Sequence, residues 1–190
     1  MKLELRMVDL LAKGGEFTIN ELARNLDEYY SLVHRIVNRL TEDGVVKKRK
    51  AGKAYLCSLN FSEKGMALLK LAELEKRDDL YAKNRKLKLI LEDFLKPLES
   101  RLVSAVLFGS YSKGMETKDS DIDVLLIVKG RADIDKVVKE IYAKYGREIS
   151  AVNMTEAEFV RQKGKPIIKE IIKNHRIIFN ADRFVNMVFG

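Results

Sequence analysis

The sequence contains a single cysteine, Cys57, and no apolar run long enough to cross a membrane. One cysteine cannot form an internal disulfide, so a reducing compartment is expected, with Cys57 as a small buried thiol. No apolar run approaches the roughly 18 residues of a membrane span, and the first residues mix charges with apolar side chains at helical spacing. We therefore expect a soluble, cytoplasmic protein without a membrane partner.

The chain of 190 residues has a net charge of +8 that is unevenly distributed. Its length allows one large domain or two small ones. The net charge, counted as Lys and Arg minus Asp and Glu, is +3 for residues 1–60, +1 for 61–100, −1 for 101–160 and +5 for 161–190. Two basic ends favour an anionic partner, nucleic acid or nucleotide, although many lysine-rich proteins are merely soluble.

The first sixty residues predict three helices followed by a β-hairpin. Apolar side chains at helical spacing indicate a helix that ends at Gly14 and Gly15, and Thr18 with Glu21 forms a capping box that opens a second helix. The segment "EYYSLVHRIVNRLTEDG" predicts a third helix, whose outward face carries Ser31, His34, Arg35, Asn38 and Arg39. The segment "VVKKRKAGKAYLCSL" then predicts a hairpin, whose basic side chains are Lys47, Lys48, Arg49, Lys50 and Lys53.

This order of elements resembles a winged helix-turn-helix domain over residues 1–60. The resemblance implies that the third helix enters the major groove and that the wing touches the DNA backbone. The residues it assigns to DNA are Arg35, Asn38 and Arg39 on the helix and Lys48, Arg49 and Lys53 on the wing. A winged helix that binds protein or dimerises remains the alternative. His34 is expected on the exposed face, because no second ligand-type residue lies at a suitable spacing for a metal.

Residues 61–99 are expected to form a helical connector. Leucine, alanine and charged residues alternate there at helical spacing, with Ser62 as a candidate cap and Pro97 near the end of a second helix. The apolar stripes of these helices either pair with a second copy in a homodimer or pack on their own chain. Both arrangements remain open.

The stretch "LFGSYSKGMETKDSDIDVLLIV" joins two apolar segments of strand length through a polar loop. Gly109 permits a sharp turn, Ser110 offers a hydroxyl and an N–H group, and Gly114 allows close approach of a ligand. Such a turn can cradle phosphate oxygens. Taken alone it is a weak signal, since most Gly-Ser turns only connect elements.

Asp121 and Asp123 strengthen this signal because they are two residues apart at the start of the second apolar segment. On a strand, residues with this spacing project from the same face. Two carboxylates about 4 Å apart repel by roughly 1 to 4 kcal/mol, depending on the local dielectric, unless a cation intervenes. Carboxylate oxygens suit Mg²⁺ or Mn²⁺. The alternative is a solubilising loop with ordinary aspartates at a strand end.

Gly109, Ser110, Gly114, Asp121 and Asp123 together resemble the nucleotidyltransferase superfamily of DNA polymerase β, most closely its minimal members, over about residues 100–190. The resemblance implies that Gly109, Ser110 and Gly114 hold a nucleoside triphosphate and that Asp121 and Asp123 hold the metals. It also implies a third carboxylate on a later strand, which binds metal and helps to deprotonate the attacking hydroxyl.

Glu148 is the candidate for this third carboxylate. It opens "REISAVNMT", which predicts a strand, and Thr155 with Glu158 forms a second capping box after it. Glu148 could instead pair with Arg147 or with a lysine at a strand edge.

The sequence thus predicts an α+β protein with a winged helix domain at 1–60, a helical connector at 61–99 and a nucleotidyltransferase domain at 100–190, built on a small mixed sheet flanked by helices. The predicted activity is the metal-dependent transfer of a nucleoside monophosphate to a hydroxyl acceptor, with ATP as the expected donor. This activity is expected in one chain with a DNA-binding winged helix domain. The alternatives are a DNA-binding regulator whose transferase domain only senses nucleotide or is inactive, and an antitoxin-like partner of a helical HEPN protein.

Overall fold

The computed structural model describes residues 1–130 and 133–190. The chain divides into two compact units, residues 1–75 with 189–190, and residues 76–188. The predicted α+β class is confirmed, while the predicted boundaries at 60 and 99 stay predictions. No helix in the described part of the chain has the length and apolar character needed to cross a membrane.

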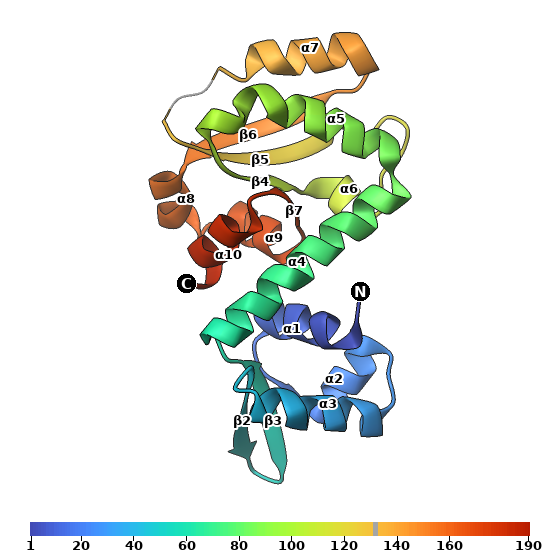
Figure 1. The fold of residues 1–190 in the computed structure, drawn as a ribbon, viewed down its shortest axis with the longest axis vertical. Helices are drawn as coiled ribbons and strands as arrows, with labels where there is room; N and C mark the ends of the chain where they lie inside the picture. Colours follow the sequence, from blue (N-terminus) through green and yellow to red (C-terminus); the bar gives the residue numbers. More distant parts are fainter. Residues whose placement is uncertain (131–132) are drawn as a thin grey trace. The chain divides into compact units, whose positions relative to one another are not determined.

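The first unit contains the three helices and the hairpin that the sequence predicts (Figure 1). Its elements are α1 Leu3–Gly14, β1 Phe17–Thr18, α2 Ile19–Leu26, α3 Tyr30–Glu42, β2 Val46–Ala51 and β3 Ala54–Leu59, followed by the start of α4 Glu63–Lys83. The strands form an antiparallel sheet in the order β1-β3-β2. The two-residue strand β1 was not predicted from the sequence, and it ties the segment before α2 to the wing.

Local sequence signals explain where these elements begin. The side chain of Thr18 accepts a hydrogen bond from the Glu21 N–H, and the Glu21 carboxylate accepts one from the Thr18 N–H, so the predicted capping box opens α2. In the wing, Ala51 pairs with Ala54, which leaves Gly52 and Lys53 as the two-residue tip. Gly52 has a φ of 60°, as such tight turns require.

The second unit is a four-stranded sheet with helices on both faces (Figure 1). After the end of α4 it contains α5 Arg85–Leu95, the 3-10 helix η1 Lys96–Arg101, β4 Leu102–Leu107, α6 Gly109–Lys113, β5 Ile122–Val128, α7 Asp135–Tyr145, β6 Ile149–Thr155, α8 Glu156–Gln162, α9 Pro166–Lys173, β7 Arg176–Phe179 and α10 Ala181–Phe189. The strand order is β6-β5-β4-β7. The β5–β6 pair is parallel and the other pairs are antiparallel, so the sheet is mixed as predicted.

The two central strands of this sheet are buried on both faces. All six residues of β4 are buried, and in β5 only Asp123 is partly exposed. One face packs against apolar side chains of α5 and α7, which are Leu87, Ile90, Leu91, Phe94, Val137 and Ile141. A partly exposed aspartate at the start of such a strand marks the place where the core ends and a polar site begins.

Candidate functional site

The turn after β4 lies directly against the start of β5. Gly109 has a φ of 67°, and a Cβ atom at this position would collide with Oδ2 of Asp123. The Phe108 N–H donates a hydrogen bond to the backbone oxygen of Asp123 at 3.0 Å. Glycine is therefore required at position 109 both by its backbone conformation and by the neighbouring carboxylate.

The two aspartates occupy different environments at this edge of the sheet. Asp123 is half-buried, whereas Asp121 is exposed just before β5. Burial, followed by the nearby charge of Asp121, raises the pKa of the Asp123 carboxyl above its ordinary value. Within residues 1–130 and 133–190 neither carboxylate makes a side-chain hydrogen bond or an ion pair. Two carboxylate groups with free oxygens fit Mg²⁺, which takes its remaining ligands from water and phosphates.

The predicted Gly-Ser turn is the first residue pair of a five-residue helix, α6. The Met115 N–H donates to the Ser110 carbonyl at 3.0 Å, and Gly114 ends the helix in the left-handed conformation with a φ of 67°. The Ser110 hydroxyl has no hydrogen-bond partner among the described residues. Ser110 is thus held by its backbone while its hydroxyl remains available to a ligand.

Glu148 lies one residue before β6, beside Asp121. Its carbonyl accepts a hydrogen bond from the Ile122 N–H at 3.0 Å, and Ile122 pairs with Ile149 in the parallel ladder. The side chain is exposed. In the part of the chain that the structure describes, no three His, Cys, Asp or Glu side chains are arranged to hold a metal ion together. The geometry therefore places Glu148 near the aspartate pair without grouping the three into one set of ligands.

Ser150, which no motif in the sequence marks, is the residue of β6 that pairs with Asp123. Paired residues of adjacent parallel strands project from the same face of the sheet, so the exposed Ser150 lies on the aspartate side of β6. Only the register of β6 against β5 reveals this, and register cannot be read from the spacing of residues along one strand.

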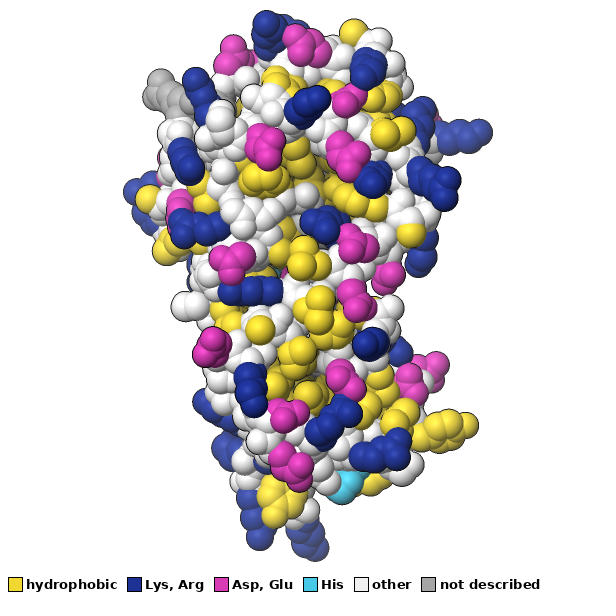
Figure 2. Space-filling model, in the orientation of Figure 1, with side chains coloured by type: hydrophobic (Ala, Val, Ile, Leu, Met, Phe, Trp, Pro, Cys, Tyr) yellow, Lys and Arg dark blue, Asp and Glu magenta, His cyan; other side chains and the backbone are white. Residues whose placement is uncertain are grey.

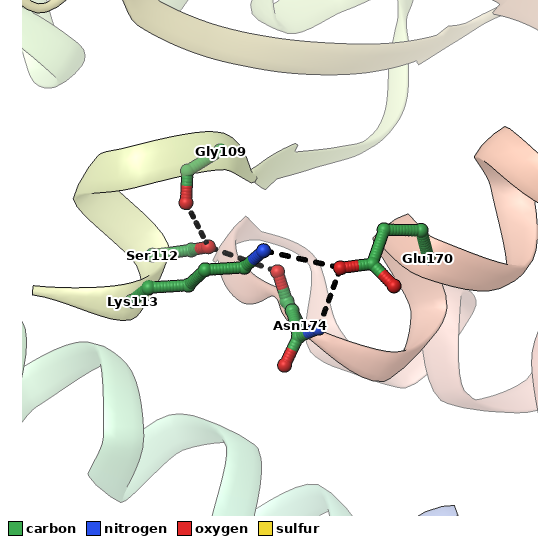
Figure 3. Close-up of polar contacts among 5 residues, drawn as sticks. All are labelled: Gly109, Ser112, Lys113, Glu170 and Asn174. Atoms are coloured by element: carbon green, nitrogen blue, oxygen red, sulfur yellow. Dashed lines mark hydrogen bonds and ion pairs between the residues drawn. The ribbon is translucent and has the colours of Figure 1, made fainter. Parts of the chain in front are cut away.

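A polar network joins α6 to the end of α9 (Figure 3). The buried Ser112 hydroxyl faces the Gly109 and Asn174 carbonyl oxygens, each at 2.9 Å. The Lys113 ammonium lies 3.1 Å from Oε1 of Glu170, and the Asn174 side-chain amide donates to the same oxygen at 2.8 Å. These bonds hold the pKa of the Glu170 carboxyl below its ordinary value, that from Lys113 most strongly. The two contacts between α6 and α9 join residues 57 and 62 positions apart, so no local pattern in the sequence predicts this network.

The predicted DNA-contacting residues of the first unit differ in their contacts. Arg35 is exposed at the surface of α3. Arg39 forms an ion pair with Glu4, and the Lys48 ammonium donates to the Asn38 side-chain oxygen. Of the six, only Arg35 and Lys53 make no side-chain hydrogen bond or ion pair among the described residues.

Arg49 is also engaged within the protein. Its guanidinium binds both carboxylate oxygens of Glu16, at 3.2 and 2.6 Å, and the hydrogen bond with Arg49 lowers the pKa of Glu16. A phosphate would have to compete with this carboxylate for the same donors.

A groove of about 410 Å³ lies between α3 and the wing of the first unit. Its lining includes aromatic and basic side chains, namely Tyr30, His34, Lys48, Lys53 and Tyr55. Tyr30 stacks on His34 with ring centroids 5.8 Å apart. Figure 2 shows dark blue Lys and Arg side chains gathered at the lower end of the view, over the wing.

Family models match both parts of the chain. A model described as nucleotidyltransferase domain matches residues 85–184, and a second, described as HVO_A0114, matches residues 2–64. Two relatives come from Methanocaldococcus jannaschii. The first, MJ1305, carries the name protein adenylyltransferase and is 32% identical over 107 residues, which are 50% of this chain and 73% of that protein. The protein named protein adenylyltransferase MJ0604 is 29% identical over 96 residues, which are 47% and 94% of the two chains.

Two solved structures align with the chain at low similarity. A toxin-antitoxin structure with AMP-PNP gives a TM-score of 0.43 at 15% identity and covers 53% of this chain and 79% of that chain. The structure of TrmBL2, an archaeal chromatin protein described as showing a novel mode of DNA binding, gives a TM-score of 0.30 at 17% identity and covers 87% of this chain and 67% of that chain.

Proposed function

The chain belongs to the nucleotidyltransferase domain family through residues 85–184, and from this membership we propose that it transfers AMP from ATP to a hydroxyl group of a protein. The Methanocaldococcus jannaschii relatives are named protein adenylyltransferases, which supports both the donor and the class of acceptor. The reaction forms a bond between the acceptor oxygen and the α-phosphorus and breaks the bond from that phosphorus to the leaving pyrophosphate.

One observation carries the proposal. Among the described residues the carboxylates of Asp121 and Asp123 have no protein partner, and the Asp123 carboxylate lies directly against Gly109, the residue before Ser110. Gly109, Ser110 and Gly114 are proposed to contact the triphosphate, and Asp121 with Asp123 to hold the cation. A divalent cation bound there would supply Lewis-acid stabilisation of the charge that develops on the phosphates.

The remaining steps belong to the residues of the chain. Asp121 and Asp123 would hold the cation at the start of β5, and the Ser110 hydroxyl would donate to a phosphate oxygen and so orient the nucleotide. Glu148, on the neighbouring strand end, is proposed to accept the proton that the attacking hydroxyl loses. Its exposed carboxylate suits an acceptor that arrives from solvent, as a protein side chain would.

Labelled ATP tests this function directly. The full-length protein with Mg²⁺ should incorporate label from ATP labelled at the α-phosphate, into itself or an added protein, and none from ATP labelled at the γ-phosphate. Asp121→Asn combined with Asp123→Asn should abolish incorporation, whereas Asp119→Asn, in the same loop, should not. Unchanged labelling by the double variant would refute the assigned site. Nucleotide binding without any transfer would instead favour the regulator that senses nucleotide.

We further propose that the first unit binds DNA through α3 and the wing. The supporting observation is the groove in which Tyr30 and Tyr55 lie beside Lys48 and Lys53, with Arg35 exposed on the same helix as Tyr30. Lysine and arginine bind phosphates, and exposed tyrosines offer flat surfaces to sugars and bases. A homodimer, a HEPN-type partner, the choice between Mg²⁺ and Mn²⁺ and a cytoplasmic location stay predictions.

A further inference from the structure

Helix α6 is too short to hold its own position. It consists of five residues, and one isolated helical turn is not stable in water. The helix begins at Gly109 and is followed by Gly114, and both glycines have a positive φ. Glycine restricts the backbone least of all residues, so neither end fixes the direction of the helix. Contacts from elsewhere in the fold must therefore fix its orientation.

Tyr111 is buried in the apolar core of the unit, and the polar contacts that orient α6 come from the end of α9. Ser112 is 3% exposed, and its single hydroxyl hydrogen is shared between the carbonyls of Gly109 and Asn174. Glu170 then accepts from Lys113 and from the Asn174 side chain through one oxygen. Figure 3 shows that the two sets of bonds meet at Asn174, so α6 is attached to α9 through both its buried and its exposed side.

The attachment acts on the residue that touches the aspartate pair. The Gly109 carbonyl accepts a hydrogen bond from the Ser112 hydroxyl. The Cα of Gly109 lies against the Asp123 carboxylate. A rotation of α6 that broke the bond from Ser112 to Asn174 would move Gly109 with respect to Asp123. The position of the turn relative to the aspartates thus depends on residues 170–174, which are distant in sequence.

We propose that Ser112 and Glu170 are positioning residues that hold the Gly109–Ser110 turn in register with Asp123 for nucleotide binding. Neither residue touches the nucleotide in this scheme: Ser112 acts through Gly109, and Glu170 acts through Lys113 and Asn174. The inference rests on the proposed nucleotide site. It adds that the affinity of this site is set partly by the end of α9.

Calorimetric titration of the full-length protein with Mg²⁺ and α,β-methylene-ATP, in which the bond between the α- and β-phosphates cannot be cleaved, tests the proposal. Ser112→Ala should raise the dissociation constant about tenfold, equivalent to about 1.4 kcal/mol. Glu170→Ala should raise it about threefold, because exposed ion pairs contribute little. Glu170→Gln, which keeps an acceptor oxygen, should restore part of the loss. The matched control is Glu140→Ala, which removes an exposed pair with Lys136 on α7.

The same titration separates positioning from a loss of folding. Chains that are irreversibly misfolded lower the number of binding sites per chain and leave the dissociation constant unchanged, whereas reversible unfolding raises the apparent dissociation constant. The titrations are therefore done at a temperature at which circular dichroism shows each variant to be fully folded. A wild-type dissociation constant for Ser112→Ala would therefore overturn the positioning role, whatever the site number. Failure of the wild-type protein to bind the analogue would overturn both this inference and the proposed nucleotide site. Binding by the wild type with unchanged variants would overturn this inference alone.

Discussion

The α-carbon of Gly109 lies so close to the carboxylate of Asp123 that a Cβ atom at position 109 would overlap Oδ2. Gly114, at the other end of α6, has the same φ of 67°, but no atom of the described residues outside its own chain neighbours lies within 4 Å of the place its Cβ would take. The two glycines thus separate the cost of a strained backbone from the cost of displacing the aspartate.

Gly109→Ala and Gly114→Ala should differ sharply for this reason. Both variants incur the strain of a left-handed residue, roughly 1 to 2 kcal/mol, but only Gly109→Ala must also push Asp123 aside. We expect thermal unfolding to show a loss of stability for both, larger for Gly109→Ala, and nucleotide titration to show a much larger loss of affinity for Gly109→Ala than for Gly114→Ala. Equal nucleotide affinities in the two variants would show that the contact with Asp123 has no role in the site.

Glu148 and Ser150 provide a second prediction, because they lie beside Asp121 and Asp123 respectively on the neighbouring strand. If Glu148 accepts the proton of the attacking hydroxyl, Glu148→Gln should lower the rate of AMP transfer by about 10² to 10⁴-fold while nucleotide affinity changes little. The measurement is incorporation of α-phosphate label at saturating ATP, beside a titration of nucleotide affinity.

Ser150→Asp provides the complementary variant. A carboxylate at position 150 would lie on the aspartate side of β6, next to Asp123, where it can complete a set of three. If transfer survives Glu148→Gln and increases in Ser150→Asp, then the third carboxylate belongs at 150, and the assignment of Glu148 is wrong. If Ser150→Asp lowers transfer while Glu148→Gln abolishes it, the assignment holds.

Local signals in the sequence predicted most of the elements of this fold. The capping boxes at Thr18 and Thr155, the hairpin of the wing and the two apolar strands around the Gly-Ser turn all appear in the structure. Each depends on residues within a few positions of one another, where side-chain chemistry restricts the backbone directly. The predicted burial of Cys57 is also confirmed, and that burial raises the pKa of its thiol.

The geometry of the candidate site was less accessible from the sequence. Spacing alone placed Asp121 and Asp123 on one face of a strand, but the neighbour of Asp123 depends on the register of β6, and a shift of one residue exchanges the two faces. The anchoring of Ser112 by Asn174 depends on a contact between residues 62 positions apart. Neither feature leaves a periodic signal along the chain.

The DNA-binding surface gives a third prediction, since the six proposed residues are not equally available. Arg35 and Lys53 face solvent, whereas Arg39 and Arg49 are paired with Glu4 and Glu16. Arg35→Ala with Lys53→Ala should weaken binding to a labelled DNA duplex and lower the slope of log affinity against log salt by about 1.8, which corresponds to two lost phosphate contacts. The measurement is fluorescence anisotropy over a range of salt concentrations.

Arg39→Ala with Arg49→Ala is the matched control for the DNA experiment, because it removes the same number of positive charges. It should reduce the affinity less, since those charges are already partly neutralised by their carboxylates. If the two double variants lose affinity equally, net charge rather than the α3 and wing surface governs binding.

The two capping boxes give a prediction about pH. Hydrogen bonds from the Thr18 backbone and hydroxyl lower the pKa of Glu21, and the same bonds from Thr155 lower that of Glu158. A carboxyl whose pKa is lower in the folded than in the unfolded protein stabilises the fold above its unfolded pKa, and this contribution disappears as the pH falls through the folded pKa. Stability should therefore decrease on acidification, with a contribution from each glutamate.

Glu21→Gln and Glu158→Gln isolate these contributions, because glutamine keeps the capping hydrogen bond but carries no charge. Each variant should melt below the wild type near neutral pH. The difference should shrink as the pH falls below the ordinary pKa of glutamate, about 4.3, towards the lowered pKa of each folded carboxylate. Circular dichroism melting across this range is the measurement, with Glu140→Gln as an exposed control. Glu21→Gln reports on the unit that contains α2, and Glu158→Gln reports on the unit that contains α8. If the melting difference between a variant and the wild type stays constant with pH, the charge of the glutamate replaced in that variant does not stabilise its unit.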